Sequence, residues 1–270
     1  MRVAFQGERG AYSEEAIIKR FGNSAEPVPR PQLRDVFEFV MGNNADLGLI
    51  PVENTIEGTV GQAWDLLMEY PLVVEGEVIL RVLHCLIANH GVVMKDVRVV
   101  YSHPQALGQC RAFLEKNGLD AISASDTAGS VRMIKELGLK DAAAIASCRA
   151  AEIYGIVVLS KGIETHSENF TRFLIIGHQR HKATGKDKTS LAFSLGTEAG
   201  SLRWALGTLV GHKVEIIRLD SRPLAGRPWQ YIFFADIVGH IDDLEVRGVI
   251  RELEKNAGWV RLLGAYPRVV

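Results

Sequence analysis

Short apolar segments typical of strands alternate with segments of helical spacing along the first 178 residues. VAFQG (residues 3–7) is typical of a strand that ends in glycine. In the following YSEEAIIKRF, Ala16, Ile17 and Phe21 recur at helical spacing, with Ser13 as the expected N-cap. Such alternation predicts largely parallel sheets joined by right-handed crossovers.

Two sets of these units predict a two-lobed α/β body with a cleft between the lobes, where the ends of strands gather ligands. We expect the first lobe to span roughly residues 1–78 plus 160–178, and the second to span 79–159. LVVEGEVILRVLHCLIAN (72–89) is β-branched and predicts one long strand that passes between the lobes. QALGQCRAFLEK (105–116) has the spacing of one helix.

The segment HQRHKATGKDK (178–188) has no large apolar residue and four Lys or Arg side chains, which predicts a linker at 179–188. We expect its two histidines, His178 and His181, to be solvated rather than metal-bound, because the sequence offers no third ligand nearby. Residues 189–270 then follow the order βαββαβ, which is typical of an α+β ferredoxin-like unit.

Composition narrows the classes of partner. Hydrophobic residues make up 47% and charged residues 23%, and the net charge is −1, so we expect an ordered chain without nucleic-acid or membrane partners. No apolar run reaches the ~18 residues of a membrane span, and no leader sequence is evident. Cys85, Cys110 and Cys148 are expected as buried free thiols in a cytoplasmic protein, with one reactive cysteine as the alternative.

Polar residues gather where two predicted strands of the first lobe end. GERGAYSEE places Gly7, Gly10 and Ser13 at a strand-to-helix turn, which either offers amides to an anion or is an ordinary helix start. PVENTIEGTV places Asn54 and Thr55 directly after the apolar strand, with Glu53 before them and Glu57 after them. A turn alone does not require so many polar side chains at the end of one strand, so they are candidates for ligand contacts.

Two further polar clusters complete the set. In YSHPQALGQC, Ser102 and His103 precede a proline suited to the first helical position, so they either meet a carboxylate or only cap the helix, and Gln109 follows on that helix. In ENFTRF, Thr171 and Arg172 are neighbours on a strand and must face opposite sides. Hydroxyls, amides and helix ends around a cleft favour a small polyanionic ligand.

Taken together and in chain order, FQGERGAYSEEA, PVENTIEGTV, YSHPQALGQC and ENFTRF resemble the prephenate dehydratase family. GSL (200–202), DSRPLAGRPWQYIFFADIVGH (220–240) and LLGAYPR (262–268) resemble the phenylalanine-sensing ACT-type domain of that enzyme. The resemblance covers nearly all 270 residues. It implies a two-lobed fold like that of type 2 periplasmic binding proteins over residues 1–178, and an ACT regulatory domain over 189–270.

The resemblance also implies an activity: a carbon–oxygen lyase that converts prephenate to phenylpyruvate in L-phenylalanine biosynthesis, with loss of carbon dioxide and water and with no cofactor or metal. Thr171 is then the catalytic residue. The candidate substrate contacts are Ser13, Asn54, Thr55, Ser102, Gln109, Arg172 and Phe173. The candidate contacts of a phenylalanine effector are Gly200, Ser201, Leu202, Asp220, Ser221, Arg222 and Pro223.

Two departures from the family pattern leave the identity of the effector open: the family commonly has glutamate at position 220, where this chain has Asp220, and often has proline where this chain has Ala199. No chorismate mutase segment precedes the matching region and no dehydrogenase follows it, so we expect a monofunctional version. We expect it to form a homodimer or homotetramer through its ACT domains.

A threonine is a poor general acid because its pKa lies far above the operating pH. We therefore expect Thr171 to donate a hydrogen bond to the departing oxygen, with Glu57 or a bound water as the alternative proton source. Arg172 either clamps a substrate carboxylate or pairs with an acidic side chain. The alternative functions are an arogenate dehydratase and a non-catalytic, amino-acid-responsive binding protein.

Overall fold

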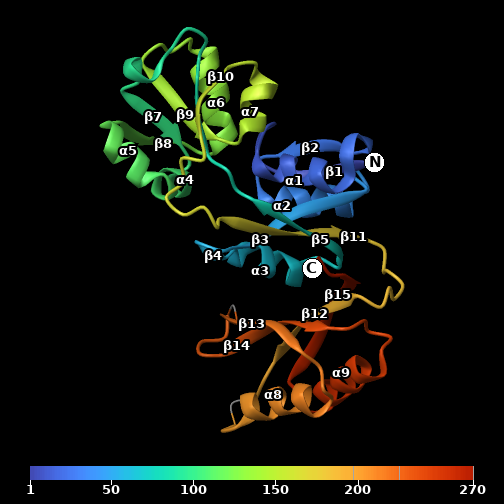
Figure 1. Cartoon of the computed structure of the whole chain (residues 1–270). Helices are drawn as coiled ribbons and strands as arrows, with labels where there is room; N and C mark the ends of the chain where they lie inside the picture. The colour runs from blue at the N-terminus through green and yellow to red at the C-terminus, as the bar shows by residue number, and fades with distance from the viewer. Residues whose placement is uncertain (197, 225, 270) are drawn as a thin grey trace. The chain divides into compact units, whose positions relative to one another are not determined.

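The computed structural model describes residues 1–196, 198–224 and 226–269, whose strands form three sheets (Figure 1). The first sheet has the order β2-β1-β3-β11-β5, with β4 paired to β3, and β1 runs parallel to both β2 and β3. Its strands are β1 (Arg2–Gln6), β2 (Glu26–Arg30), β3 (Leu47–Asn54), β4 (Gly58–Thr59), β5 (Val73–Arg81) and β11 (Phe170–Gly177).

Three helices belong to this part of the chain: α1 (Tyr12–Phe21), α2 (Leu33–Met41) and α3 (Gly61–Glu69). In α2 the apolar residues recur three and four positions apart and are all buried, as an amphipathic helix requires (Leu33, Val36, Phe37 and Val40). The predicted α/β alternation is confirmed here.

The second sheet has the order β10-β6-β9-β7-β8 and mixes parallel with antiparallel pairs. Its strands are β6 (Cys85–Ala88), β7 (Val99–Ser102), β8 (Asp120–Ser123), β9 (Ala142–Ala146) and β10 (Val157–Lys161). Its helices are α4 (Pro104–Gln109), α5 (Arg111–Asn117), α6 (Thr127–Glu136) and α7 (Cys148–Tyr154). The strand β9 is buried throughout: Ala143 and Ile145 pack in one core cluster and Ala144 and Ala146 in another, so helices can cover both faces.

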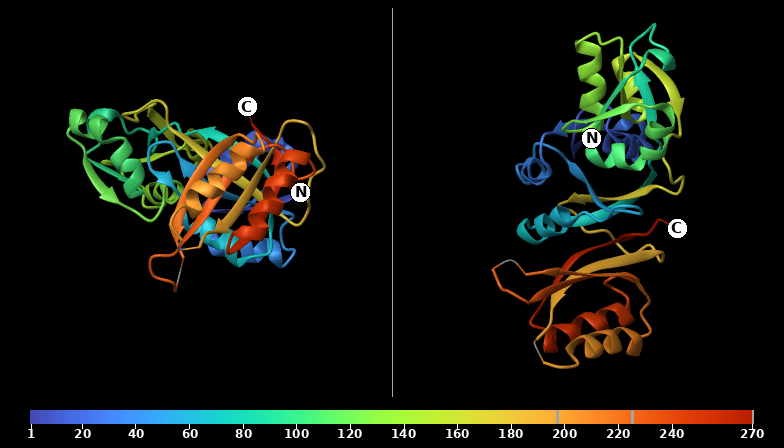
Figure 2. Two further views of the ribbon diagram at one scale, coloured as in Figure 1. Left: turned by 90° about the horizontal axis from the view of Figure 1, so that it is seen from below. Right: turned by 90° about the vertical axis from the view of Figure 1, so that its left-hand side faces the viewer.

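The third sheet is antiparallel with the order β13-β14-β12-β15, and Figure 2 shows its two helices side by side. Its elements are β12 (Asp187–Ser194), α8 (Ser201–Gly211), β13 (Ile216–Pro223), β14 (Tyr231–Val238), α9 (Leu244–Asn256) and β15 (Trp259–Pro267). This order confirms the predicted βαββαβ unit. Leu191, Leu209 and Val249 belong to one core cluster of this unit.

The chain divides into two compact units. One comprises Met1–Ala63 and Val78–Phe173, and the other comprises Trp64–Glu77 and the residues from Leu174 onward. The boundary therefore runs through α3, β5 and β11.

Three local predictions were wrong. The helix after β1 begins at Tyr12 with Ala11 as its N-cap, so Ser13 lies inside the first turn and caps nothing. The predicted long strand is two strands, β5 and β6, in different sheets. The chain leaves the first sheet after Arg81, where the amide of Val82 donates to the carbonyl of Asn169 at 2.8 Å.

The predicted helix over 105–116 breaks at Cys110, which has φ −101° and ψ 11°. The carbonyl of Gln109 accepts a hydrogen bond from the amide of Thr165 at 2.8 Å, and this partner replaces the next intrahelical one. The predicted linker is also shorter than expected. Asp187 already begins β12, because its carboxylate accepts from the Thr184 amide and hydroxyl at 2.6 and 2.7 Å and fixes the turn before the strand.

The prediction of three free thiols was wrong as well. Cys85 at the start of β6 and Cys148 at the start of α7 form a disulfide, with their Cα atoms 5.7 Å apart. The pairing arises because β6 lies beside β9, and α7 follows β9 after a single residue. Cys110 is a buried free thiol. Within the described residues, no helix is long and apolar enough to cross a bilayer.

Candidate active site

The side chains of Asn54 and Thr171 meet at one edge of the first sheet. Asn54 ends β3, Thr171 lies near the start of the adjacent strand β11, and both side chains are partly exposed. The two hydrogens of the Asn54 NH₂ are shared among three acceptors: Thr171 Oγ1 at 3.0 Å, Asn169 Oδ1 at 2.8 Å and the carbonyl of Phe170 at 3.1 Å. Two residues that the sequence placed in separate motifs are therefore in direct contact.

The orientation of the Asn54 carboxamide is fixed by the turn that follows β3. Its Oδ1 accepts from the backbone amides of Ile56 and Glu57 at 2.9 and 3.0 Å, so its NH₂ must point toward β11. Thr171 Oγ1 is therefore an acceptor in this bond. The hydroxyl proton of Thr171 stays available to a group outside the sheet.

Gln109 joins this site from the second sheet, at the end of α4. Its Oε1 accepts from Asn169 Nδ2 at 2.7 Å, and its Nε2 donates to Glu57 Oε1 at 3.1 Å. Asn169 is fully buried and links Gln109 to Asn54. Sequence reasoning missed Asn169, although it lies inside the ENFTRF motif.

His84 and Tyr12 extend the chain of hydrogen bonds inward. His84 Nε2 lies 2.8 Å from Gln109 Oε1, and Nδ1 lies 2.7 Å from the hydroxyl of Tyr12, which is 3.2 Å from the carbonyl of Leu83. Burial lowers the pKa of His84 below its ordinary value of 6.5, against an opposing effect of the hydrogen bond to Gln109. Burial raises the pKa of Tyr12. Sequence reasoning missed both residues: His84 sits within an apolar segment, and in the GERGAYSEE motif the glycines and Ser13 were the candidates rather than Tyr12.

Thr55 and Arg172 brace the same strand ends. Thr55 Oγ1 donates to the carbonyl of Glu168 and accepts from the amide of Phe170, both at 2.9 Å. The side chain of Arg172 is 12% exposed and lies 3.9 Å from Glu53 (NH1 to Oε2). This geometry favours pairing with an acidic side chain over a carboxylate clamp.

Three predicted substrate contacts are buried in this structure. Phe173 is 2% exposed and lies in the core, and Ser13 is 8% exposed. Ser102 is fully buried, and its Oγ donates to the carbonyl of Ile145 at 2.6 Å, which ties β7 to β9. His103, rather than Ser102, caps α4 by accepting from the amide of Gln105 at 3.3 Å.

The turn after β1 joins the two lobes rather than leaving its amides open to a ligand. The amide of Gly10 donates to the buried carboxylate of Glu14 at 2.8 Å, and its carbonyl accepts from Ser147 Oγ at 2.6 Å. Gly10 has φ +88°, and a Cβ at this position would lie 2.7 Å from the Cα of Ala150. Only glycine allows so close an approach.

The candidate effector residues lie in two segments of the third sheet's unit. At the first, Gly200 precedes α8 with φ 93°, Ser201 Oγ donates to the carbonyls of Gly196 and Glu198, and Leu202 is 41% exposed. These bonds shape the turn itself.

The second segment ends the edge strand β13. Asp220 lies 2.8 Å from Arg218, and Arg222 makes a bidentate pair with Asp65 of α3 at 2.7 and 3.1 Å, while Pro223 ends the strand. Ser221 donates its backbone amide to Asp220 at 2.8 Å.

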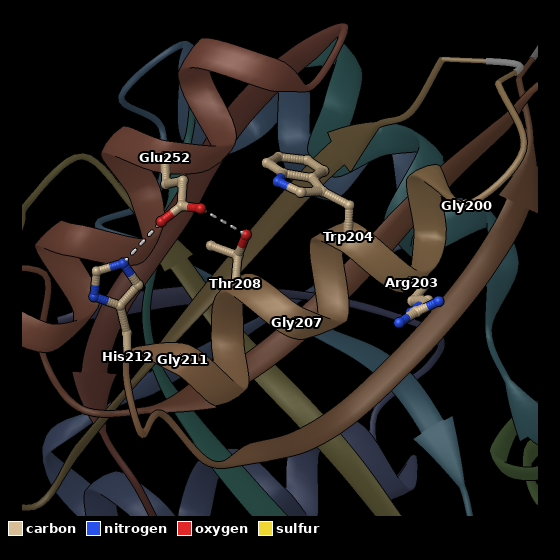
Figure 3. A pocket seen from close by; sticks show the side chains of 8 residues that line it. All are labelled: Gly200, Arg203, Trp204, Gly207, Thr208, Gly211, His212 and Glu252. Carbon is tan, nitrogen blue, oxygen red and sulfur yellow. Dashed lines mark hydrogen bonds and ion pairs between the residues drawn. The ribbon is translucent and has the colours of Figure 1, made fainter.

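A pocket of about 660 Å³ lies along α8 (Figure 3). Its floor is glycine-rich, and Glu252 of α9 reaches His212 at 3.0 Å and Thr208 at 3.2 Å. The lining residues are Gly200, Arg203, Trp204, Gly207, Thr208, Gly211, His212 and Glu252. The pocket thus includes one candidate effector residue, Gly200. In the described part of the chain, no group of three or more His, Cys, Asp or Glu side chains could hold a metal ion.

Comparisons with known proteins agree on one family. The family model described as "PDT: Prephenate dehydratase" matches residues 3–181. The chain is 37% identical to a bifunctional chorismate mutase/prephenate dehydratase of Aquifex aeolicus, over all of this chain and 74% of the relative. It is 40% identical to the chloroplastic arogenate dehydratase/prephenate dehydratase 2 of Arabidopsis thaliana, over 99% of this chain and 73% of the relative.

Two solved structures share the fold over the whole chain. One is the prephenate dehydratase of Arthrobacter aurescens in complex with L-Phe, with a TM-score of 0.91 and 28% identity, covering 99% of this chain and 90% of that one. The other is GqqA, described as a novel type of quorum quenching acylase, with a TM-score of 0.92 and 32% identity, covering 100% of this chain and 98% of that one.

Proposed function

The chain belongs to the prephenate dehydratase family, and from this premise we propose that it is a dehydratase that converts prephenate to phenylpyruvate with loss of carbon dioxide and water. The catalytic body in this proposal is residues 1–178, followed by a linker and an ACT regulatory domain over 189–270. That the protein is monofunctional, unlike its bifunctional relatives, stays a prediction.

The observation that carries the proposal is the hydrogen bond from Asn54 Nδ2 to Thr171 Oγ1. Because Thr171 accepts this bond, its own proton can be donated to the ring hydroxyl that leaves prephenate. The bond strengthens as negative charge develops on the departing oxygen, so it stabilises the transition state more than the ground state. Loss of carbon dioxide and hydroxide creates an aromatic ring, so the driving force lies in the substrate.

The other polar groups of the site orient Thr171 and the substrate and donate no proton to the departing oxygen. Asn54, Asn169 and Gln109 are neutral amides that connect both lobes around Thr171. A fixed, neutral environment of this kind holds the reacting groups in place without attracting water to the departing oxygen. Glu57, which accepts from Gln109, remains the alternative proton source.

Arogenate is the second candidate substrate, because the Arabidopsis relative is named for both arogenate and prephenate. The two substrates differ at the amino or keto group. The test is a comparison of kcat/KM on prephenate and arogenate with the purified protein. We expect phenylpyruvate from prephenate to be the faster product, and a protein that turns over neither substrate would contradict dehydratase function and favour a binding role.

Acylase activity, which the description of GqqA names for that protein, would require a nucleophile activated by a base. Thr171 has the opposite arrangement. The NH₂ of Asn54 donates to its hydroxyl oxygen and cannot remove its proton. We therefore rank the dehydratase above an acylase.

For the C-terminal unit we propose feedback control by L-phenylalanine. The Arthrobacter structure with L-Phe and the matching segments at 200–202 and 220–223 support this proposal. We place the effector between paired ACT domains of a homodimer or homotetramer, since one unit of this size offers little enclosure. The test is whether phenylalanine inhibits the dehydratase activity. If the activity does not change with phenylalanine, the domain serves oligomerisation alone.

A further inference from the structure

We propose that His84 is a positioning residue of the dehydratase site: as the neutral tautomer with hydrogen on Nε2, it fixes the carboxamide of Gln109 and, through Asn169 and Asn54, the hydroxyl of Thr171. This inference rests on the proposed function and deepens it. His84 lies outside every motif that identified the site, and its side chain is 2% exposed.

The direction of each hydrogen bond between Glu57, Gln109 and His84 follows from groups that can only donate or only accept. The carboxylate of Glu57 accepts, so the Nε2 of Gln109 must face it. The Oε1 of Gln109 then faces inward, where Asn169 Nδ2 lies 2.7 Å away and His84 Nε2 lies 2.8 Å away. An amide oxygen only accepts, so Nε2 of His84 carries a hydrogen.

The other ring nitrogen is supported from α1. The hydroxyl of Tyr12 lies 2.7 Å from His84 Nδ1 and 3.2 Å from the carbonyl of Leu83, so the shorter bond goes to the bare nitrogen. Two carboxylates lie around His84. That of Glu164 accepts from the backbone amide of His84 at 3.0 Å, and that of Glu57 lies on the far side of Gln109. Burial disfavours the imidazolium form, which keeps the ring neutral.

The network has only one consistent orientation. Asn54 cannot turn over, because its Oδ1 is held by two backbone amides. If Gln109 turned over, its NH₂ would face the NH₂ of Asn169, and a reversed Asn169 would face the NH₂ of Asn54. Both errors place donor against donor. His84 Nε2–H adds a further donor that holds the Gln109 oxygen inward, and the Tyr12 hydroxyl supports the other nitrogen of the same ring.

The kinetic test compares His84→Leu with His84→Gln on the full-length protein. A leucine removes the donor, so we expect kcat on prephenate to fall about tenfold with KM within about threefold, as the loss of one buried hydrogen bond allows. A glutamine places an NH₂ near the position of Nε2 and should restore kcat to within about threefold of wild type. His90→Leu is the control, because His90 bonds the carbonyl of Gly155 at 2.9 Å away from this network, and it should not alter kcat.

The second test reads the tautomer without substrate. In protein labelled with ¹⁵N-histidine, the signal that disappears in His84→Gln should be that of an Nε2–H imidazole, and Tyr12→Phe should keep this form because the Gln109 oxygen still faces Nε2. An Nδ1–H signal in wild type would overturn the inference. So would a folded His84→Leu variant with wild-type kcat, or a His84→Gln variant as slow as His84→Leu, which would indicate packing alone. A wild-type protein inactive on prephenate and arogenate would refute the proposed function instead, and the tautomer measurement would then decide whether His84 holds the network.

Discussion

The carboxamide of Asn54 has its two ends committed to different tasks. The oxygen accepts hydrogen bonds from two backbone amides of the turn after β3. The nitrogen donates to the hydroxyl of Thr171 and to the carbonyl at the start of β11. A single side chain thus sets both the turn and the donor direction of the hydroxyl. In the proposed mechanism this arrangement lets a threonine, with its high pKa, assist a departing hydroxide without transferring a full proton.

The Asn54→Asp variant tests this donor direction. The new carboxylate keeps an oxygen for the turn but has no proton for Thr171, whose hydroxyl would then donate to it instead of to the substrate. We expect kcat on prephenate to fall by ~10²–10³, the usual cost of one placed donor. Asn117→Asp, at an exposed asparagine that bonds only its own helix, is the control and should behave as wild type. Wild-type turnover in Asn54→Asp would contradict the assigned direction.

His84 also predicts how stability depends on pH. Its pKa in the folded chain lies below 6.5, so the unfolded chain binds a proton at a pH where the folded chain does not. This contribution to stability is present above about pH 6.5 and is lost as the pH falls. His84→Gln does not titrate, so the free energy of unfolding measured by denaturant at pH values from about 7.5 down to about 5 should fall less steeply than in wild type. An equal slope in both proteins would contradict the prediction, and His90→Gln serves as the matched control.

At the scale of elements, local periodicity predicted most helices and strands, and contacts distant in sequence decided the rest. β2 contains Pro27 and Pro29, which the sequence analysis did not assign to a strand, yet an edge strand tolerates prolines because one side needs no amide donors. The break between α4 and α5 depends on Thr165, more than 50 residues away along the chain. No local pattern contains that information.

In the candidate site too, some residues were predictable from local sequence and others were not. Thr171, Asn54 and Gln109 were predictable because polar side chains at the ends of apolar strands stand out. His84 was not, because it sits within an apolar segment where a buried and satisfied side chain is the ordinary expectation. Tyr12 was not, because the sequence does not show that its hydroxyl turns toward His84. Their role depends on α1 and the start of β6 lying close together, which only the fold provides.

The ion pair between Asp65 of α3 and Arg222 of β13 leads to a prediction about regulation. Arg222 lies in the candidate effector segment and pairs with Asp65 of α3. The helix α3 begins shortly after β4, which pairs with the end of β3 at Asn54. We expect Asp65→Asn to raise the phenylalanine concentration for half-inhibition by about fivefold or more, within the range of ordinary allosteric coupling. Its stability should change by no more than about 1 kcal/mol, because the pair is partly exposed.

Activity without effector should stay at the wild-type level in Asp65→Asn, and inhibition curves measured on both proteins provide the comparison. Glu136→Gln, which neutralises an exposed acid at the end of α6, controls for the change in charge. Unaltered inhibition in Asp65→Asn would show that this pair does not transmit the effector signal.

At the scale of the whole molecule, the cysteines allow a simple count. The chain has three, of which Cys85 and Cys148 are joined, and burial raises the pKa of the thiol of Cys110. Titration of protein purified without reductant should find no reactive thiol in the native state and one after unfolding, and three after reduction. Three thiols without reduction would contradict the disulfide. Because disulfides persist mainly in oxidising compartments, the count also bears on the predicted cytoplasmic location.

The proposed role of the Thr171 hydroxyl in the first sheet can be measured directly, as the rate of phenylpyruvate formation from prephenate by wild type, Thr171→Ala and Thr171→Ser. We expect alanine to lower kcat by ~10²–10³ in a protein with wild-type thermal stability, and serine, which keeps the hydroxyl, to stay within about tenfold of wild type. Near-normal turnover by a folded Thr171→Ala variant would contradict this role.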